Sequence, residues 1–228
     1  LSRNFHLPGL NDLYWIPGGN LNLKPEKGYS SDISLEYKEQ IGSSLKIDSR
    51  LNIYYSLIDD WIIWRPGEYG YWTAENIQKV ASRGVEYQFF ADYDLEKLQT
   101  TLFVNYSFTK ATNLENSYLN ADTEGKQLIY VPMHKGNTAL RLSLLSNYIS
   151  YNFSYTGKRY TTTSNEESRN SLPAYVLHGF NIGREFNVNR FSADLNVRIN
   201  NLLGLDYQAV LERAMPGRNY QLTLNMRF

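Results

Sequence analysis

The chain has 228 residues, and its 23 Lys and Arg residues balance 23 Asp and Glu residues, so its formal net charge is zero. This balance argues against a nucleic-acid partner, because phosphate binding requires a basic surface. The absence of cysteine excludes disulfides and thiolate metal sites. Mean hydropathy is −0.47 and no run of 18 apolar residues occurs, which excludes a spanning helix but not a spanning strand.

Tyrosine is frequent, with 19 residues against 10 phenylalanines. A tyrosine ring combines an apolar body with a polar hydroxyl, so this excess suits side chains at a boundary between lipid and water. Several tyrosines fall near the ends of the strands predicted below, where we expect aromatic girdles, with ordinary cross-strand packing as the alternative. They are Tyr37, Tyr54, Tyr93, Tyr148, Tyr151, Tyr175 and Tyr220.

Taken in chain order, nine segments alternate apolar and polar residues with the period of two that is typical of β-strands. The alternation is regular in all of them except 174–184, which is predicted mainly because the neighbouring strands need a partner. The nine predicted strands are 32–38, 45–55, 85–93, 98–108, 139–144, 149–156, 174–184, 191–200 and 220–228.

In the last two predicted strands, apolar and polar residues separate cleanly onto two faces. We predict that one face meets lipid and that the other lines a wet lumen. A soluble β-sandwich, whose core uses the same alternation, is the alternative. The predicted lipid-facing residues are Leu195, Val197, Leu222 and Leu224, and the predicted lumen-facing residues are Asn196, Arg198, Gln221 and Thr223.

The connections alternate between short turns and long loops, which favours a barrel of the outer membrane, where short turns are periplasmic and long loops are external. On this interpretation residues 1–28 are the end of an external loop. The strands that close the barrel are expected before Leu1, because an open sheet edge is costly in lipid. The short turns are 40–43, 94–97, 146–147 and 187–190, and the long loops are 59–76, 111–135, 160–172 and 201–217.

Two ordered sets of residues in the loops resemble signatures of the TonB-dependent outer-membrane receptors. The opening set contains an aromatic, a proline, a Leu-Tyr pair, GN and LKPE, and the closing set contains Asn-Leu, a tyrosine, PGR and a terminal Phe. The 155–160 and 172–175 segments also resemble this family, so the resemblance covers essentially the whole chain. The residues are Phe5, Pro8, Leu13, Tyr14, Gly19, Asn20, Leu23, Lys24, Pro25 and Glu26, then Asn201, Leu202, Tyr207, Pro216, Gly217, Arg218 and Phe228.

The resemblance implies an all-β fold, an antiparallel transmembrane β-barrel of about 22 strands, of which residues 1–228 supply the last nine. It also implies a plug domain and a TonB-contacting segment on the N-terminal side, and nothing in this sequence resembles either. The implied partners are outer-membrane lipid, the TonB complex through that N-terminal region, a surface lipoprotein and a small-molecule nutrient. The resemblance implies no resident cofactor.

The four tryptophans and three tyrosines fall in predicted external loops or next to them. Such rings could form a wall that recognises a large, flat ligand such as a chelate or a corrinoid. The alternative is that they pack loop against loop and keep the long loops ordered. These candidate ligand-binding residues are Tyr14, Trp15, Trp61, Trp64, Tyr69, Tyr71 and Trp72.

No catalytic or metal site is expected, because the sequence has no nucleophile elbow, no HExxH and no Gly-rich phosphate loop. The three histidines, His6, His134 and His178, share no ligand spacing. The leading hypothesis is active import of a metal chelate, haem or cobalamin. The alternatives are an oligosaccharide importer of the same family, a passive porin, and a barrel enzyme, which would need a Ser/His/Asp set that the sequence does not show.

Overall fold

The computed structural model describes residues 1–67, 70–115, 123–166, 171–188 and 191–227. Within them, ten strands form one antiparallel sheet in the order β1-β2-β3-β4-β5-β6-β7-β10-β11-β12, and β8 and β9 form a small separate pair. The strands are β1 Ser2–His6, β2 Glu26–Ile41, β3 Leu45–Pro66, β4 Trp72–Leu95, β5 Leu98–Asn113, β6 His134–Leu144, β7 Asn147–Thr156, β8 Arg159–Tyr160, β9 Ser171–Leu172, β10 Tyr175–Val188, β11 Phe191–Asn200 and β12 Asn219–Arg227, with one helix, α1 Leu10–Tyr14.

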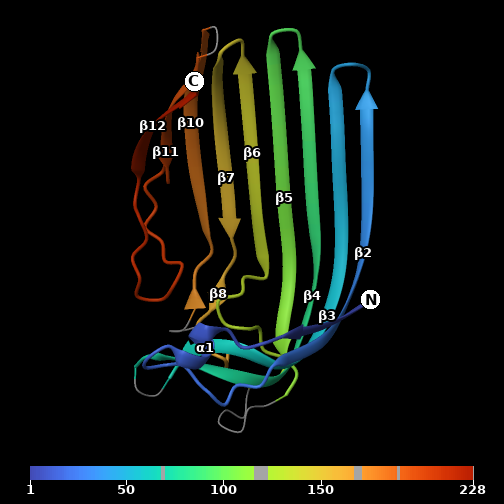
Figure 1. Ribbon diagram of the computed structural model, residues 1–228, viewed down its shortest axis with the longest axis vertical. Helices are drawn as coiled ribbons and strands as arrows, with labels where there is room; N and C mark the ends of the chain where they lie inside the picture. Colours follow the sequence, from blue (N-terminus) through green and yellow to red (C-terminus); the bar gives the residue numbers. More distant parts are fainter. Residues whose placement is uncertain (68–69, 116–122, 167–170, 189–190, 228) are drawn as a thin grey trace.

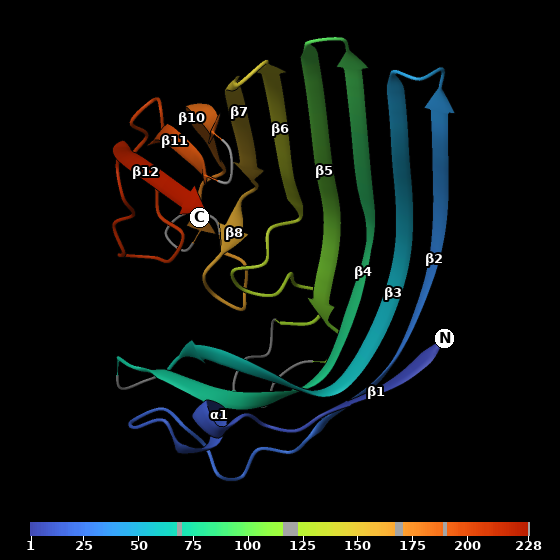
Figure 2. The same ribbon diagram turned by 45° about the horizontal axis from the view of Figure 1, so that its top comes forward.

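The sheet is a curved wall rather than a closed barrel (Figures 1 and 2). Neighbouring strands are joined by tight turns at one end, which is the top of Figure 1, and by the long connections at the other. This is the asymmetry that the sequence predicts. No helix in the described residues is long and apolar enough to cross a membrane.

The strand register confirms the predicted faces. One rung of the sheet runs from Leu142 on β6 through Ile149, Ile182 and Val197 to Leu222 on β12, so these side chains lie on the same face. The next rung pairs Leu195 with Leu224 on that face, and the intervening rungs pair Asn196 with Thr223 and Arg198 with Gln221 on the other.

The apolar face is open rather than sandwiched. Leu222 is 72% exposed and Leu224 56% exposed, and Leu195 and Val197 are each 40% exposed. A soluble protein does not leave a continuous leucine and isoleucine surface uncovered. The β-sandwich alternative is therefore wrong, because these residues do not form a dry interior.

All nine predicted strands are present, including the irregular 174–184 segment, which lies in β10. Residues 1–28, expected as the end of an external loop, are not irregular throughout, because Ser2–His6 pair with Glu26–Ser30 as β1 and β2. These segments have no regular alternation, so the period of two does not reveal them.

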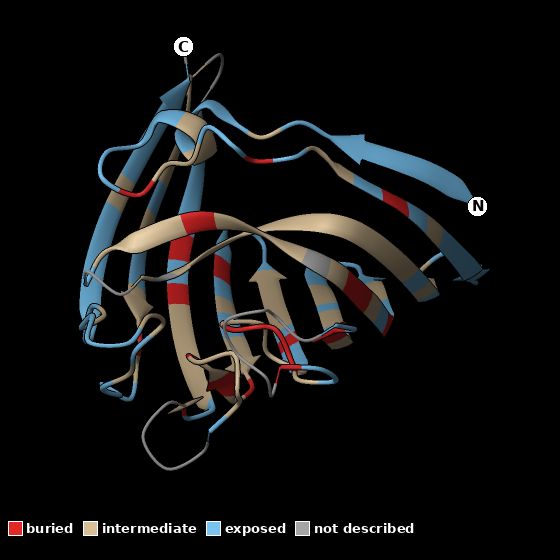
Figure 3. Ribbon diagram, turned by 90° about the horizontal axis from the view of Figure 1, so that it is seen from below, coloured by how far each residue is buried: buried red, intermediate tan, exposed pale blue. Residues whose placement is uncertain are grey.

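The expected long loop at 59–76 is mostly paired strand rather than irregular chain. β3 and β4 remain paired as far as Pro66 and Trp72, so only the tip of a long hairpin is irregular. The hairpin bends near Asp60, whose φ is 58°, and its tip crosses the mouth of the curved sheet (Figure 3). Side chains on both of its faces are partly buried, so its apolar residues do not alternate with polar ones as in a strand with one wet face.

A small core lies beneath the hairpin, at the loop end of β4 and β5. Val80, Ala111 and Leu128 are buried together, and Trp61 packs against them. Gln127 joins this core to the returning loop, because its side-chain carbonyl accepts the backbone N–H of Ala111 at 3.1 Å and its amide donates to the carbonyl oxygens of Thr109 and Val131.

Three of the expected girdle tyrosines, Tyr54, Tyr148 and Tyr175, lie on the concave face instead, and two of them cover glycines. The Tyr54 hydroxyl is hydrogen-bonded to Thr109 at 3.0 Å, and its ring covers Gly84, where an added Cβ would lie 2.6 Å from the hydroxyl oxygen. Tyr148 covers Gly183 in the same way and is buried. For Tyr54 and Tyr148 the cross-strand packing alternative is correct.

Candidate functional site

The β3–β4 hairpin is fixed to the N-terminal loop across the mouth of the sheet. The backbone N–H of Ala74 donates to the carbonyl of Gly18 at 2.9 Å, and the Asn20 amide donates to the carbonyl of Ala74 at 3.2 Å. The backbone N–H of Ile62 donates to the Glu26 carboxylate at 2.8 Å. Because these bonds attach the loop at several points along its length, hairpin and loop form one unit.

A pocket of about 650 Å³ opens between this unit and the loop that connects β11 to β12. Its walls are mostly aromatic and aliphatic, with one carboxylate and one guanidinium. The volume is within the range of sites that take a drug-sized or larger molecule. The lining residues are Asn11, Asp12, Trp15, Pro17, Trp64, Tyr71, Trp72, Val210 and Arg213.

Asp12 fixes the orientation of one wall. One of its carboxylate oxygens accepts the indole N–H of Trp64 at 2.7 Å, and the other accepts the backbone N–H of Gly9 at 2.8 Å. A Trp ring held by its only donor keeps a defined face toward the cavity. On the far side, the Trp72 ring lies 5.6 Å from that of Tyr130, centre to centre.

The structure brings together four of the seven aromatic residues proposed from the sequence: Trp15, Trp64, Tyr71 and Trp72. It separates Trp61, which packs in the core under the hairpin, and Tyr14, which is 63% exposed but does not line the pocket. Tyr69 lies outside the described residues. Trp61 and Trp64 therefore have different roles, although both precede the same hairpin tip.

The sequence did not single out Asp12, Pro17 or Arg213 as pocket residues. Asp12 and Pro17 lie within the opening signature and are close to Trp15 in the sequence, but the sequence does not predict the hydrogen bond from Trp64 to Asp12. Arg213 comes from a loop about 150 residues further along the chain than Trp64, and no sequence pattern connects the two. Among the described residues, no group of three or more His, Asp or Glu side chains is placed to hold a metal ion.

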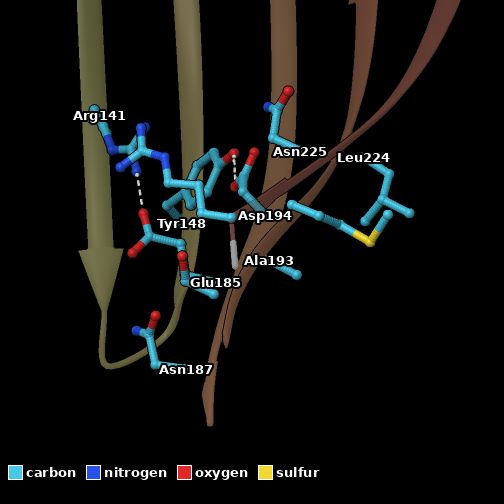
Figure 4. Close-up of a pocket in the computed structure, with 11 residues that line it drawn as sticks. Arg141, Tyr148, Glu185, Asn187, Ala193, Asp194, Leu224 and Asn225 are labelled. Carbon is cyan, nitrogen blue, oxygen red and sulfur yellow. Dashed lines mark hydrogen bonds and ion pairs between the residues drawn. The ribbon is translucent and has the colours of Figure 1, made fainter. Parts of the chain in front are cut away.

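A second hollow, of about 720 Å³, lies on the concave face near the short-turn end. In Figure 4 the Arg141 guanidinium faces Glu185, at 3.5 Å, and the Tyr148 hydroxyl donates to Asp194, at 2.8 Å. Arg141 also lies 3.7 Å from the centre of the Tyr148 ring. This hollow is polar and charged, as expected for the lumen side.

The residues of the two signatures mainly hold loops together. Asn201 is buried, and its side chain both accepts from the backbone N–H of Leu205 and donates to the carbonyl of Leu205, while the N–H of Leu202 donates to the carbonyl of His178. Asn20 and Glu26 bind the hairpin as described above. Pro8, Gly19, Pro25, Pro216, Gly217 and Arg218 do not line the pocket, and Phe228 lies outside the described residues.

Arg159 fastens the loop that supplies Val210 and Arg213. It is 4% exposed, and its guanidinium donates to the carbonyl oxygens of Pro173 at 3.0 Å, Gln208 at 3.2 Å and Ala209 at 3.3 Å. Burial lowers the pKa of Arg159, but an arginine remains protonated at neutral pH. One buried cation therefore joins three stretches of loop.

We expect Arg159→Met to release this loop, because three backbone carbonyls lose a charged donor, at a cost of roughly 1–3 kcal/mol of local stability. Hydrogen exchange of the amides between 202 and 210 should accelerate about tenfold or more, whereas strand amides should be unchanged. Lys158→Met removes a cation from the same loop and should leave the exchange rates unaltered. Equal exchange in both variants would contradict this role for Arg159.

A curved antiparallel sheet with an exposed apolar face, a polar concave face and a pocket across its loop end is part of the wall of a transmembrane β-barrel receptor. The family described as TonB dependent receptor-like, beta-barrel matches residues 1–202. The chain belongs to this family of TonB-dependent receptors, which are outer-membrane proteins of Gram-negative bacteria and comprise receptors and transporters rather than enzymes.

Two curated relatives are vitamin B12 transporters BtuB. The protein of Photobacterium profundum is 28% identical over 230 residues, which cover 98% of this chain and 34% of the relative. That of Vibrio vulnificus (strain YJ016) is 25% identical, covering 98% of this chain and 33% of the relative. The chain therefore spans about a third of the length of these relatives.

A solved structure shares the fold. The ferric-catecholate import receptor Fiu from E. coli K12 superposes with a TM-score of 0.65, at 20% sequence identity, and the match covers 99% of this chain and 32% of that one. At this level of identity the similarity shows the barrel fold alone.

Proposed function

We propose that the protein containing this chain binds a scarce nutrient in the pocket between the N-terminal loop, the β3–β4 hairpin and the β11–β12 loop, and imports it with energy supplied through TonB. The observation that carries the proposal is the convergence of four aromatic side chains from two of these segments on one cavity at the external mouth. Aromatic walls with few charges suit large, partly flat ligands.

Among such nutrients we propose cobalamin first. The two curated relatives named above are vitamin B12 transporters, and a pocket of about 650 Å³ can receive one edge of a corrinoid. Arg213 is the cation of the lining, and its guanidinium can donate to a ligand phosphate or amide oxygen. Ferric siderophores, haem and oligosaccharides are the competing ligands.

The test compares two neighbouring aromatic residues in the full-length receptor. Trp15 lines the pocket and is 59% exposed, while Tyr14 is similarly exposed but does not line it. Trp15→Ala should weaken cyanocobalamin binding about tenfold, because it removes one aromatic contact surface, whereas Tyr14→Ala should bind as the wild type does. Isothermal titration of cyanocobalamin, haem and a ferric catecholate against each variant provides the measurement.

If another probe binds tightly and Trp15→Ala weakens its binding, that probe replaces cobalamin as the proposed ligand, and the pocket remains the proposed binding site. Equal binding by both variants would reject the pocket itself. Energy coupling is tested separately, by uptake of radiolabelled ligand into cells with and without TonB. Uptake that persists without TonB would support a passive porin instead.

A further inference from the structure

Two cations lie side by side on the outward face of the sheet. Arg83 on β4 and Lys110 on β5 are direct cross-strand partners, and the next pair on the same face is Val85 with Phe108. Val85 and Phe108 belong to the apolar face, since side chains two residues apart in a strand share a face. Arg83 and Lys110 therefore point away from the lumen, at the end of the sheet that carries the long loops.

More positive charge surrounds this pair on the adjoining strands. Four residues further out, Lys79 on β4 faces Asp59 on β3, which in turn faces Lys27 on β2. Lys79 and Asp59 form an ion pair at 3.5 Å. Together with Arg83 and Lys110, this makes four cations and one carboxylate on one part of the outward surface, which we call the outer basic patch.

The position of the patch relative to the tyrosines indicates its depth. Tyr87 and Tyr106 are cross-strand partners on the same face, 40% or less exposed, and four residues below Arg83 and Lys110. Four residues of a strand span about 13 Å, less the strand tilt. Tyrosines on the lipid face are typical of the interface, so the outer basic patch lies at the level of the lipid headgroups in the outer leaflet.

The pairing of Arg83 with Lys110 is unfavourable by itself. Like charges directly opposite each other on neighbouring strands destabilise a sheet. Within the part of the chain that the structure describes, neither side chain forms an ion pair, and Arg83 is exposed. An anion placed between them would remove the repulsion. A phosphate fits this position, because a guanidinium binds phosphate through two parallel hydrogen bonds and an ammonium binds it as a point charge.

We propose that the outer basic patch binds the phosphate groups of a phosphorylated lipid of the outer leaflet, with Arg83 and Lys110 as the central pair. The occupant is an anionic lipid rather than free phosphate, because the outward face below the pair continues past Tyr87 and Tyr106 to apolar residues such as Phe89 and Val104, which would contact the acyl chains of the same molecule. This inference does not depend on which nutrient the receptor imports.

The test uses the full-length receptor in detergent and native mass spectrometry with three probes: a diphosphorylated lipid A, the same lipid without phosphates, and inorganic phosphate. Arg83→Gln combined with Lys110→Gln should weaken lipid A binding roughly 25-fold, since each cation near an anionic lipid surface contributes about fivefold. The matched control, Lys97→Gln combined with Arg184→Gln, removes two positive charges outside the patch, in the β4–β5 turn and on β10, and should bind as the wild type does.

The charge-preserving pair Arg83→Lys with Lys110→Arg should retain binding, which separates the loss of charge from a fault in folding. Equal binding of the phosphorylated and dephosphorylated lipids would overturn the proposal. So would wild-type affinity in the Gln pair, or complete displacement of lipid A by millimolar inorganic phosphate, which would identify a site for a free anion.

Discussion

Leu195→Arg should lower the free energy of unfolding of the barrel in lipid by up to roughly 2–4 kcal/mol, the cost of an arginine on the lipid face if that position is at the midplane. Leu195 lies in the middle of β11, points outward and is paired with Leu224. Its other cross-strand partner is Arg184, so a second arginine would add repulsion between like charges.

The adjacent residue provides the control. Asn196 points into the lumen, donates to the Asp194 carboxylate at 2.8 Å and is paired with Thr223. Asn196→Arg should therefore change stability little, because the new cation meets water and a carboxylate. Denaturant titration of full-length variants folded into phosphatidylcholine vesicles gives both values. Equal destabilisation by the two substitutions would mean that the two faces have been assigned incorrectly.

Gly18→Ala should weaken nutrient binding about 10- to 100-fold without preventing barrel formation. A Cβ at Gly18 would lie 1.8 Å from the carbonyl oxygen of Trp72 and 3.0 Å from the Trp64 ring. The hairpin would have to move away, and the bond from Ala74 to Gly18 would be lost. Overpacking of this kind costs roughly 1–3 kcal/mol. Because the added methyl pushes two walls of the pocket apart, we expect this free energy to be lost from ligand binding.

Gly217→Ala is the matched control, since it lies in another long loop and an added Cβ there would meet nothing within 4 Å. Affinity is measured by isothermal titration, and barrel formation by the shift in gel mobility between heated and unheated samples. Wild-type affinity in the Gly18 variant would show that the N-terminal loop and the hairpin do not need to touch for ligand binding.

Sequence reasoning works well where one face of a strand meets lipid and the other meets water. Leu195 and Asn196 are adjacent residues with opposite environments, and that contrast is a local property that a period of two reports directly. The alternation of short and long connections is local as well. For these reasons the strands, their faces and the class of protein followed from the sequence.

Prediction from the sequence fails where both faces of a strand contact other parts of the protein. Trp61 packs into the core and Trp64 bonds to Asp12 on the opposite side of the same hairpin, so the segment has no polar face and was expected to be a loop. The pocket could be predicted only in part, for a related reason. Aromatic residues in loops were visible, but the meeting of Asp12 with Trp64, or of Trp72 with Arg213, depends on how the hairpin bends at Asp60.

The three-part construction of the pocket limits how ligand preference can change. Residues 11–17, the hairpin tip and residues 210–213 each supply one wall, and the first two are joined by one backbone hydrogen bond and several side-chain hydrogen bonds, which fix the gap between them. Transplanting a single loop from a receptor with another cargo would leave two walls shaped for the old one. Exchange of selectivity should therefore require all three segments to be transferred together as a cassette.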